Sequence, residues 1–268
     1  MFSKLVNDVM ISPKCNSRDG RKISRITIHH SAGVSTAADL LYYFYTTNKD
    51  ASANYVIGND GLIGGCVPEE FRAWTSGSWD NDSQAITIEV SNSVYGEPWP
   101  VGTAAWNSMI RLCVDICRRY GFRLWTDKNK KAGSLTAHRW YQQTVCPGTY
   151  LYDRFEKICD EVNKVLDYEK KVDDLEKTVV ALTSVVGDLK KTVDAIDITL
   201  EAVKQQSAKT AEEVLPVYRS VDAVPDWYHD AVEMLVKSGA IQGVSSTDIH
   251  VNKLMARIFT ILEREGII

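Results

Sequence analysis

The stretch ISRITIHH, residues 23–30, decides the fold class that the sequence predicts. Its second half, Ile26-Thr27-Ile28, alternates apolar and polar residues as a half-buried strand does. The run ends in His29-His30, so His29 would project from the end of a strand. The two imidazoles make the end of this strand a candidate functional site.

Strands and helices alternate through the following residues. The run QAITIEV, 84–90, is a second strand, with Ile86, Ile88 and Val90 on one face and Glu89 opposite them. Asn59-Asp60-Gly61 between two apolar runs predicts a hairpin over 54–66. Helices are predicted at 37–47 after an N-cap at Thr36, at 103–120 before Gly121, and at 151–166. Interleaved strands and helices indicate an α/β domain over residues 1–165.

Residues 168–203 carry the clearest periodic pattern in the chain, with apolar side chains spaced alternately by four and three. The heptad a positions are Val172, Val179, Val186, Val193 and Leu200, and the d positions are Leu175, Leu182, Leu189, Ile196 and Val203. So narrow a seam favours self-association over the alternative, one amphipathic helix lying on its own N-terminal domain. β-branched a positions favour a parallel dimer, whereas the uncharged g positions Thr178, Val185, Thr192 and Thr199 leave a trimer or tetramer open.

The last segment, 216–268, is predicted to be a small helical domain. Pro225 suits the first position of a helix that ends at Gly239, and a second helix is predicted over 252–265. About fifty residues make a marginal core, so docking onto the coiled coil or onto other copies would help this segment fold.

Composition excludes several classes of function. The 268 residues carry a net charge of −4, which gives no basic footprint for nucleic acid. No run approaches the 18 apolar residues of a membrane span, and six thinly spread cysteines do not resemble a disulfide framework. The N-terminal residues contain no apolar h-region, so we expect synthesis in a cytoplasm without a signal peptide.

The run TAHRWYQQTVCPG, 136–148, suggests a metal ion. Zinc takes histidine nitrogen and cysteine thiolate, and a catalytic zinc site uses three protein ligands and keeps one position open. His29, His138 and Cys146 supply such a set, and Pro147-Gly148 lets the chain turn away sharply. Each residue alone is weak evidence, because single histidines and cysteines are more often ordinary core or surface residues.

Five ordered motifs turn this suggestion into a resemblance. They are ITIHHSA (26–32), SANYVIGNDG (52–61), FRAWTSG (71–77), AITIEVSN (85–92) and TAHRWYQQTVCPG (136–148). Together they resemble the type-2 N-acetylmuramoyl-L-alanine amidases, zinc enzymes that share a fold with peptidoglycan recognition proteins and phage amidase lysozymes. The resemblance covers about residues 20–160 and implies a mixed central sheet flanked by helices.

The resemblance also implies roles for single residues. His29, His138 and Cys146 would bind Zn²⁺, whereas His30 matches no ligand position. Glu89 would be the catalytic base. The alternative is an ordinary glutamate that faces the surface. Thr144 would hydrogen-bond an oxyanion, in a position where many relatives carry lysine. The residues expected to contact substrate are Trp74, Asn54 and Trp140, with core packing as the equal alternative for the two tryptophans.

Two further departures from the family pattern concern transition-state stabilisation. Ala53 stands where many relatives carry tyrosine, and Thr75 stands where a histidine often follows the motif RAW. Both leave the predicted ligands intact.

The last segment resembles a single S-layer homology unit. Val224-Pro225-Asp226-Trp227-Tyr228, Gly239-Ala240-Ile241 and Gly243 match its pattern, although its threonine-arginine-alanine-glutamate signature is reduced to Met255-Ala256-Arg257-Ile258. Such units bind cell-wall polymers, so a secondary cell-wall polymer is an expected partner of residues 216–268.

The sequence therefore predicts three parts: a zinc amidase domain at 1–165, a coiled-coil oligomerisation helix at 166–210 and a small wall-binding domain at 216–268. The expected substrate is the amide bond between N-acetylmuramic acid and L-alanine in bacterial peptidoglycan. We interpret the chain as a phage or prophage endolysin that reaches the wall through a holin pore or after lysis. The alternatives are a non-catalytic zinc-containing recognition module and a purely structural tail protein, of which the second leaves the three metal-binding residues unexplained.

Overall fold

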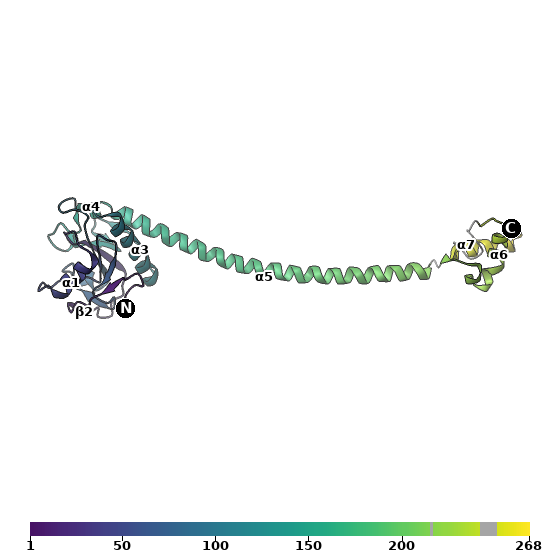
Figure 1. The fold of residues 1–268 in the computed structure, drawn as a ribbon, viewed down its shortest axis with the longest axis horizontal. Coiled ribbons are helices and arrows are strands. Elements are labelled where there is room, and N and C mark those ends of the chain that lie inside the picture. The colour runs from purple at the N-terminus through teal and green to yellow at the C-terminus, as the bar shows by residue number, and fades with distance from the viewer. Residues whose placement is uncertain (215–216, 242–250) are drawn as a thin grey trace. The chain divides into compact units, whose positions relative to one another are not determined.

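The computed structural model describes residues 1–214, 217–241 and 251–268, which form two compact units, Met1–Lys177 and Thr178–Ile268 (Figure 1). In the first unit the elements are β1 (Asp8–Val9), β2 (Cys15–Ser17), β3 (Arg25–His30), α1 (Ala37–Thr46), β4 (Tyr55–Ile57), β5 (Ile63–Gly65), β6 (Phe71–Ala73), α2 (Trp79–Asp82), β7 (Ala85–Val90), α3 (Thr103–Tyr120), β8 (Thr126–Asp127), β9 (Ala132–Gly133), β10 (Leu135–Ala137), η1 (His138–Trp140) and α4 (Gly148–Asp153). Helix α5 (Phe155–Val214) begins in the first unit and ends in the second.

A six-stranded sheet in the order β1-β5-β4-β7-β3-β10 organises the first unit. Strands β4, β7, β3 and β10 pair in parallel, whereas β4 and β5 form the antiparallel hairpin predicted around Asp60-Gly61. The sheet is therefore mixed and flanked by helices, which confirms the predicted fold class, together with a long helix and a helical C-terminal region.

The two faces of the sheet differ because apolar and polar residues alternate along its central strands. One face carries Ile26, Ile28, Ile86 and Ile88, which are completely buried in one large core with residues of α3 and the start of α5. The opposite face packs on α1 through a smaller cluster of Leu40, Leu41, Phe44, Ala53, Val56 and Cys66. One face of the sheet thus packs into the main core, and the other face carries the polar side chains of the central strands.

Helix ends follow the predicted signals. Thr36 and Asp39 form a capping box at the start of α1, and Gly121 ends α3 in the left-handed conformation at φ +72°. The helix expected over 151–166 is divided, because the backbone N–H of Arg154 bonds to Leu151 and Tyr152 in a tightened last turn of α4. Helix α5 then starts at Phe155, which is completely buried, and continues to Val214 without interruption.

A buried ion-pair network fixes the loop that follows β5. The Glu69 side chain is only 1% exposed and accepts two hydrogen bonds from the guanidinium of Arg119. The hydroxyls of Tyr55 and Tyr120 donate to the same carboxylate. All of the lone pairs that a buried carboxylate must satisfy thus have partners, which is the condition under which such a charge is tolerated.

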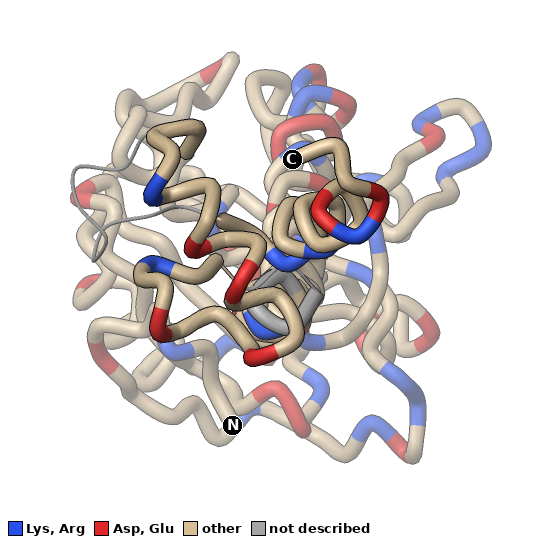
Figure 2. The backbone as a smooth tube through the Cα atoms, turned by 90° about the vertical axis from the view of Figure 1, so that its right-hand side faces the viewer, with Lys and Arg blue, Asp and Glu red and all other residues tan. Residues whose placement is uncertain are grey.

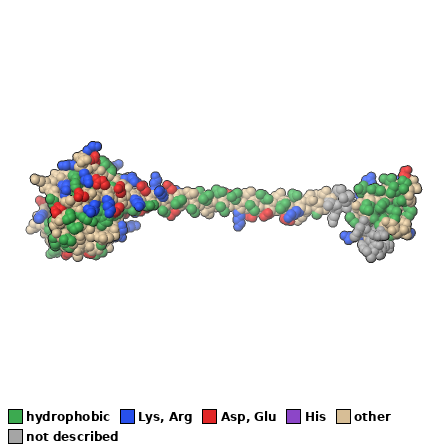
Figure 3. All heavy atoms as spheres, turned by 90° about the horizontal axis from the view of Figure 1, so that it is seen from above, with side chains coloured by type: hydrophobic (Ala, Val, Ile, Leu, Met, Phe, Trp, Pro, Cys, Tyr) green, Lys and Arg blue, Asp and Glu red, His purple; other side chains and the backbone are tan. Residues whose placement is uncertain are grey.

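The heptad positions of α5 are solvent-exposed in the single chain. Between 48% and 65% of each a and d side chain from Val172 to Val203 is exposed. Figure 3 shows hydrophobic side chains along this helix. Helical structure over 168–203 is confirmed, and association of these helices stays a prediction.

The C-terminal part of the second unit contains β11 (Val217–Tyr218), η2 (Val221–Ala223), α6 (Asp226–Lys237), β12 (Val251–Asn252) and α7 (Lys253–Arg264). Its core consists of Val221, Val224, Val232, Val251 and Ala256. Pro225 directly precedes the first helical residue instead of occupying that position, and Gly239 has φ +76° beyond the end of α6. Gly243, part of the predicted S-layer homology pattern, lies outside the described residues.

Lysines and arginines are interspersed with aspartates and glutamates along the backbone, with long uncharged stretches between them (Figure 2). Among residues 1–214, 217–241 and 251–268, no helix combines the length and the apolar character that crossing a bilayer requires.

Candidate metal centre and catalytic site

Strand register brings the site residues together. In the parallel pair β3 and β7, His29 lies opposite Glu89, so both side chains leave the same face of the sheet. On the other side of β3, Ala137 of β10 pairs with Ile28, and His138 therefore follows next to His29. Glu89 lies on the face opposite Ile86, Ile88 and Val90, as the alternation of its strand predicts.

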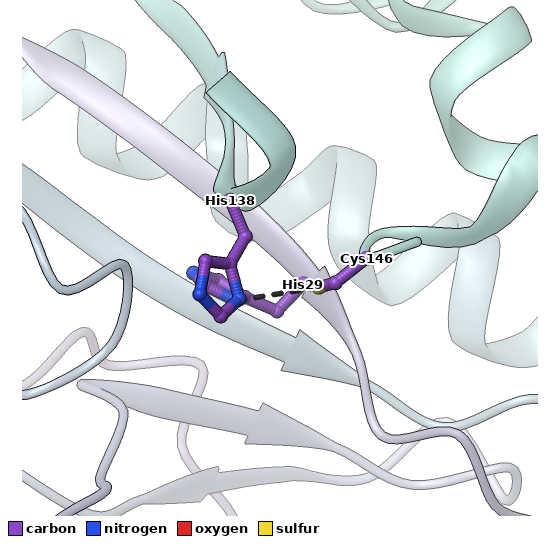
Figure 4. Close-up of side chains that lie close together, drawn as sticks. All are labelled: His29, His138 and Cys146. Atoms are coloured by element: carbon purple, nitrogen blue, oxygen red, sulfur yellow. Dashed lines mark hydrogen bonds between the residues drawn. The ribbon is translucent and has the colours of Figure 1, made fainter. Parts of the chain in front are cut away.

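The three predicted metal ligands converge (Figure 4). One ligand atom each from His29, His138 and Cys146 lies within 4.8 Å of the other two. Nδ1 of His29 is 3.4 Å from Sγ of Cys146, and the two imidazole centroids are 4.9 Å apart. Zinc bonds of about 2.1 Å to nitrogen and about 2.3 Å to sulfur at a tetrahedral angle separate two ligand atoms by roughly 3.6 Å. The observed spacing and donor set therefore fit Zn²⁺.

Burial shifts the pKa values of two donor groups, those of His29 and Cys146, because it disfavours their charged forms when no cation is bound. His29 is 1% exposed and its pKa is lowered well below the ordinary value, first by burial and then by the neighbouring His138, so the imidazole is neutral and able to bind a metal. Burial and the charge of Glu89 raise the pKa of the Cys146 thiol. A divalent cation favours the thiolate and reverses that shift. Nε2 of His29 is buried with no hydrogen-bond partner among the described residues.

Glu89 is the carboxylate beside this cluster. Its Oε1 lies 3.8 Å from Nδ1 of His29, and the side chain keeps 15% exposure. Its Oε2 is buried and has no partner among the residues that the structure describes. Burial raises the pKa of Glu89 to about 8, whereas a cation held by His29 acts in the opposite direction. With Oε2 unpaired in the described part of the chain and the side chain partly exposed, the Glu89 carboxyl group is available to exchange a proton.

The segment between His138 and Gly148 is closed by its own hydrogen bonds. Nε of Arg139 donates to the carbonyl of Cys146 over 3.2 Å, and the backbone N–H of Cys146 donates to Oγ1 of Thr144 over 3.2 Å. Gly148 has φ +78°, and a Cβ there would lie 2.8 Å from Cβ of Trp99. Glycine is thus required where the chain turns away from Cys146, for conformation and for space.

The remaining predicted site residues differ in how exposed they are and in which groups they contact. The Thr144 hydroxyl accepts one bond and keeps its own hydrogen for another acceptor, two residues from Cys146. Trp74 is partly exposed, and its Nε1 donates to Oδ1 of Asn16. Trp140 is 8% exposed in the main core and donates from Nε1 to the Tyr152 hydroxyl, so packing accounts for it.

Asn54 needs a correction. It is completely buried, and its Nδ2 donates to the carbonyls of Val67 and Phe71. Its Oδ1 accepts from the backbone N–H of Thr87. The amide therefore ties β4 to β7 and to the loop before β6, and it has no free polar atom for a substrate.

The sequence interpretation missed two neighbours of the site. The Trp99 ring lies 5.1 Å from that of His30, in a backbone with φ +59° that bulky residues rarely adopt. No local signal identifies this position. Oε1 of Gln142 lies 3.1 Å from Nε2 of His138, and their spacing of four residues is a signal that could have been used.

Comparisons with known proteins agree on the first part of the chain. Residues 19–149, just under half of the 268, match the family described as N-acetylmuramoyl-L-alanine amidase. No curated protein matches the chain.

Three similar solved structures can be named, all at low identity. PlyL is 17% identical, with 59% of this chain and 96% of that chain covered and a TM-score of 0.44. The amidase LysC from Clostridium intestinale is also 17% identical, with coverages of 58% and 97% and a TM-score of 0.43. An AmpD derivative is 19% identical, with coverages of 59% and 96% and a TM-score of 0.44.

Proposed function

We propose that the first unit hydrolyses the amide bond between N-acetylmuramic acid and L-alanine in bacterial peptidoglycan. The observation that carries the proposal is the convergence of His29, His138 and Cys146 next to the half-buried Glu89, in a segment that matches the amidase family. These three residues would hold a zinc ion through three protein donors, the number that catalytic zinc sites use.

The same residues would hold Zn²⁺ through two imidazole nitrogens and one thiolate. When bound, Zn²⁺ supplies Lewis-acid chemistry, because it acidifies coordinated water and polarises a carbonyl oxygen. The buried position of His29 and Cys146 excludes bulk water from two of the three ligands. This keeps the ligands ordered and the site in a low dielectric.

The chain's own groups carry the proton and position the substrate. Glu89 accepts a proton from the attacking water and returns it to the amine that leaves, which requires a carboxyl group in reach of both positions. The Thr144 hydroxyl donates to the oxygen on which negative charge develops. Trp74, which is partly exposed whereas Trp140 is buried, contacts the saccharide.

The test is digestion of purified peptidoglycan with the full-length protein. Amidase cleavage creates new L-alanine amino termini and no new reducing sugar ends, which separates it from glycosidase cleavage. Glu89→Gln should keep one zinc per chain and lose activity, whereas Cys146→Ala should lose both. Peptidoglycan binding with full zinc content and no new amino termini would contradict the proposal and favour the non-catalytic recognition module.

We further propose that residues 168–203 form a parallel homo-oligomeric coiled coil. Ten exposed apolar side chains in unbroken heptads along one helix support it (Figure 3). Light scattering of the full-length protein tests it, since a monomer at tens of micromolar would be incompatible with the seam. Gathered copies of residues 216–268 would bind a secondary cell-wall polymer with avidity.

We propose release to the wall through a membrane pore or by lysis, as expected for an endolysin. Expression in a Gram-positive host with and without a pore-forming holin tests this, since lysis without the holin would contradict it.

A further inference from the structure

His138 has two ring nitrogens, and the structure distinguishes them. Nε2 lies 3.1 Å from Oε1 of Gln142. A carboxamide oxygen only accepts hydrogen bonds, so this contact requires a hydrogen on Nε2. A neutral imidazole with hydrogen on Nε2 has its lone pair on Nδ1. The lone pair of His138 is then free for the metal that His29 and Cys146 would share.

Gln142 is itself held in place from two directions. Its backbone N–H donates to the carbonyl of His138 over 3.2 Å, which fixes the turn and brings the two side chains to the same side. Its carboxamide lies against Gly77, where a Cβ would come within 1.8 Å of the Gln142 Nε2 atom. Gly77 also has φ +71°, so any other residue there would be strained and would displace the carboxamide.

The loop that carries Gly77 is anchored as well. Both Thr75 and Ser76 donate hydroxyl bonds to the carboxylate of Asp82, and the backbone N–H of Ser76 donates to it over 3.0 Å. Asp82 is 1% exposed. A rigid loop therefore limits where the Gln142 side chain can go, although Gln142 itself is exposed.

We infer that Gln142 is a positioning residue that fixes His138 in the Nε2–H form and thereby directs Nδ1 to the metal. This rests on the proposed zinc site. Partners of this kind, which orient a ligand without touching the metal, typically contribute 10- to 100-fold to metal affinity. The plainer explanation is an exposed glutamine that meets a histidine by proximity alone.

The experiment compares Gln142→Ala, Gln142→Glu and Gln143→Ala in the full-length protein, with zinc affinity measured by competition with a chromophoric chelator. Gln142→Ala should weaken zinc binding by about 10- to 100-fold. Gln142→Glu retains an acceptor oxygen and should bind zinc at least as tightly as the native protein. Gln143→Ala removes the exposed neighbour and should stay within about twofold.

A second readout does not depend on metal or activity. Long-range ¹H–¹⁵N spectra of the chelated protein report which ring nitrogen of His138 carries the hydrogen. The native protein should show Nε2–H, and Gln142→Ala should show a mixture. Unchanged zinc affinity and an unchanged tautomer in Gln142→Ala would overturn the inference, and so would a native protein that binds no zinc.

The two proposals fail separately. A native protein that binds zinc but releases no L-alanine termini would remove the amidase proposal and leave Gln142 in its role, provided that the affinity of Gln142→Ala falls. A native protein that cleaves peptidoglycan, with zinc bound equally by Gln142→Ala, would remove only the role of Gln142.

Discussion

Replacing Glu89 by glutamine should stabilise the metal-free protein at neutral pH and should remove most of the proposed amidase activity. The carboxylate is 15% exposed, its Oε2 has no partner in the described residues, and burial raises its pKa from 4.5 to about 8. Between pH 4.5 and pH 8 the folded chain therefore holds a proton that the unfolded chain has released. Unfolding becomes easier as the pH rises through this interval, because proton release favours the unfolded state.

The magnitude follows from the width of that interval. Each pKa unit corresponds to about 1.4 kcal/mol, so this group alone should lower the free energy of unfolding by about 3 kcal/mol between pH 5 and pH 7. Glutamine has nearly the same shape and does not titrate. The stability difference between Glu89→Gln and the native protein should therefore grow by about 3 kcal/mol over these two pH units.

Urea unfolding in the presence of a strong chelator measures this difference. Tryptophan fluorescence suits it, because six of the seven tryptophans lie between Trp74 and Trp140 in the first unit. Other titrating groups are common to both proteins and cancel in the comparison. Added zinc should shrink the difference, because a nearby cation favours the charged carboxylate. If the free energies of unfolding of the two chelated proteins depended on pH in the same way, the reasoning would be refuted.

In a separate assay, the amidase activity proposed for the native protein should fall by about 10²-fold or more in Glu89→Gln.

Three other outcomes are expected. Cys146→Ala should bind no zinc by elemental analysis and should release no L-alanine termini, and full zinc occupancy in that variant would exclude Cys146 as a ligand. Glu69→Gln should lower the free energy of unfolding in urea by about 3 kcal/mol, because the Arg119 charge loses its buried partner, whereas the exposed Glu70→Gln should change it by less than about 1 kcal/mol. Aspartate at both Val186 and Leu189 should convert the proposed oligomer to monomers in light scattering without changing cleavage of soluble muropeptides. An oligomer that stays intact in this variant would exclude these residues from the seam.

Local sequence signals predicted most of the elements in the first unit. Alternation in residues 85–90 placed Glu89 correctly away from the isoleucines, and Thr36 and Gly121 marked helix ends that the structure confirms. These succeed because strand period and capping depend on residues close in sequence. The break at Arg154 was not predicted, since nothing in its neighbourhood distinguishes a tightened turn from a continuing helix.

For the candidate site, the sequence indicated the donor residues but not the contacts made by Asn54 and Trp99. Three candidate ligands that lie together in the structure could be selected because their residue types are few and chemically distinctive. Asn54 carried no such signal, and its buried amide became occupied by contacts with strands that are distant in sequence. Trp99 lies in a segment without regular structure, where the approach to His30 depends on a left-handed backbone that a sequence pattern does not specify. Contacts between distant loops are decided by tertiary structure, so they appear only once the sheet is assembled.

The strand order sets when the donor cluster can form during synthesis of the chain. Strand β3 lies between β7 and β10 in the sheet. Its His29 is therefore synthesised 60 residues before Glu89 and more than 100 residues before His138. At roughly 5–20 residues per second this delay amounts to several seconds. Glu89 and the neighbouring strand arrive first, and His138 and Cys146 complete the cluster almost last in the matching segment. A nascent chain arrested before Ala137 would carry the isoleucine-rich strands but only one of the three donor residues, so the cluster assembles late in biogenesis.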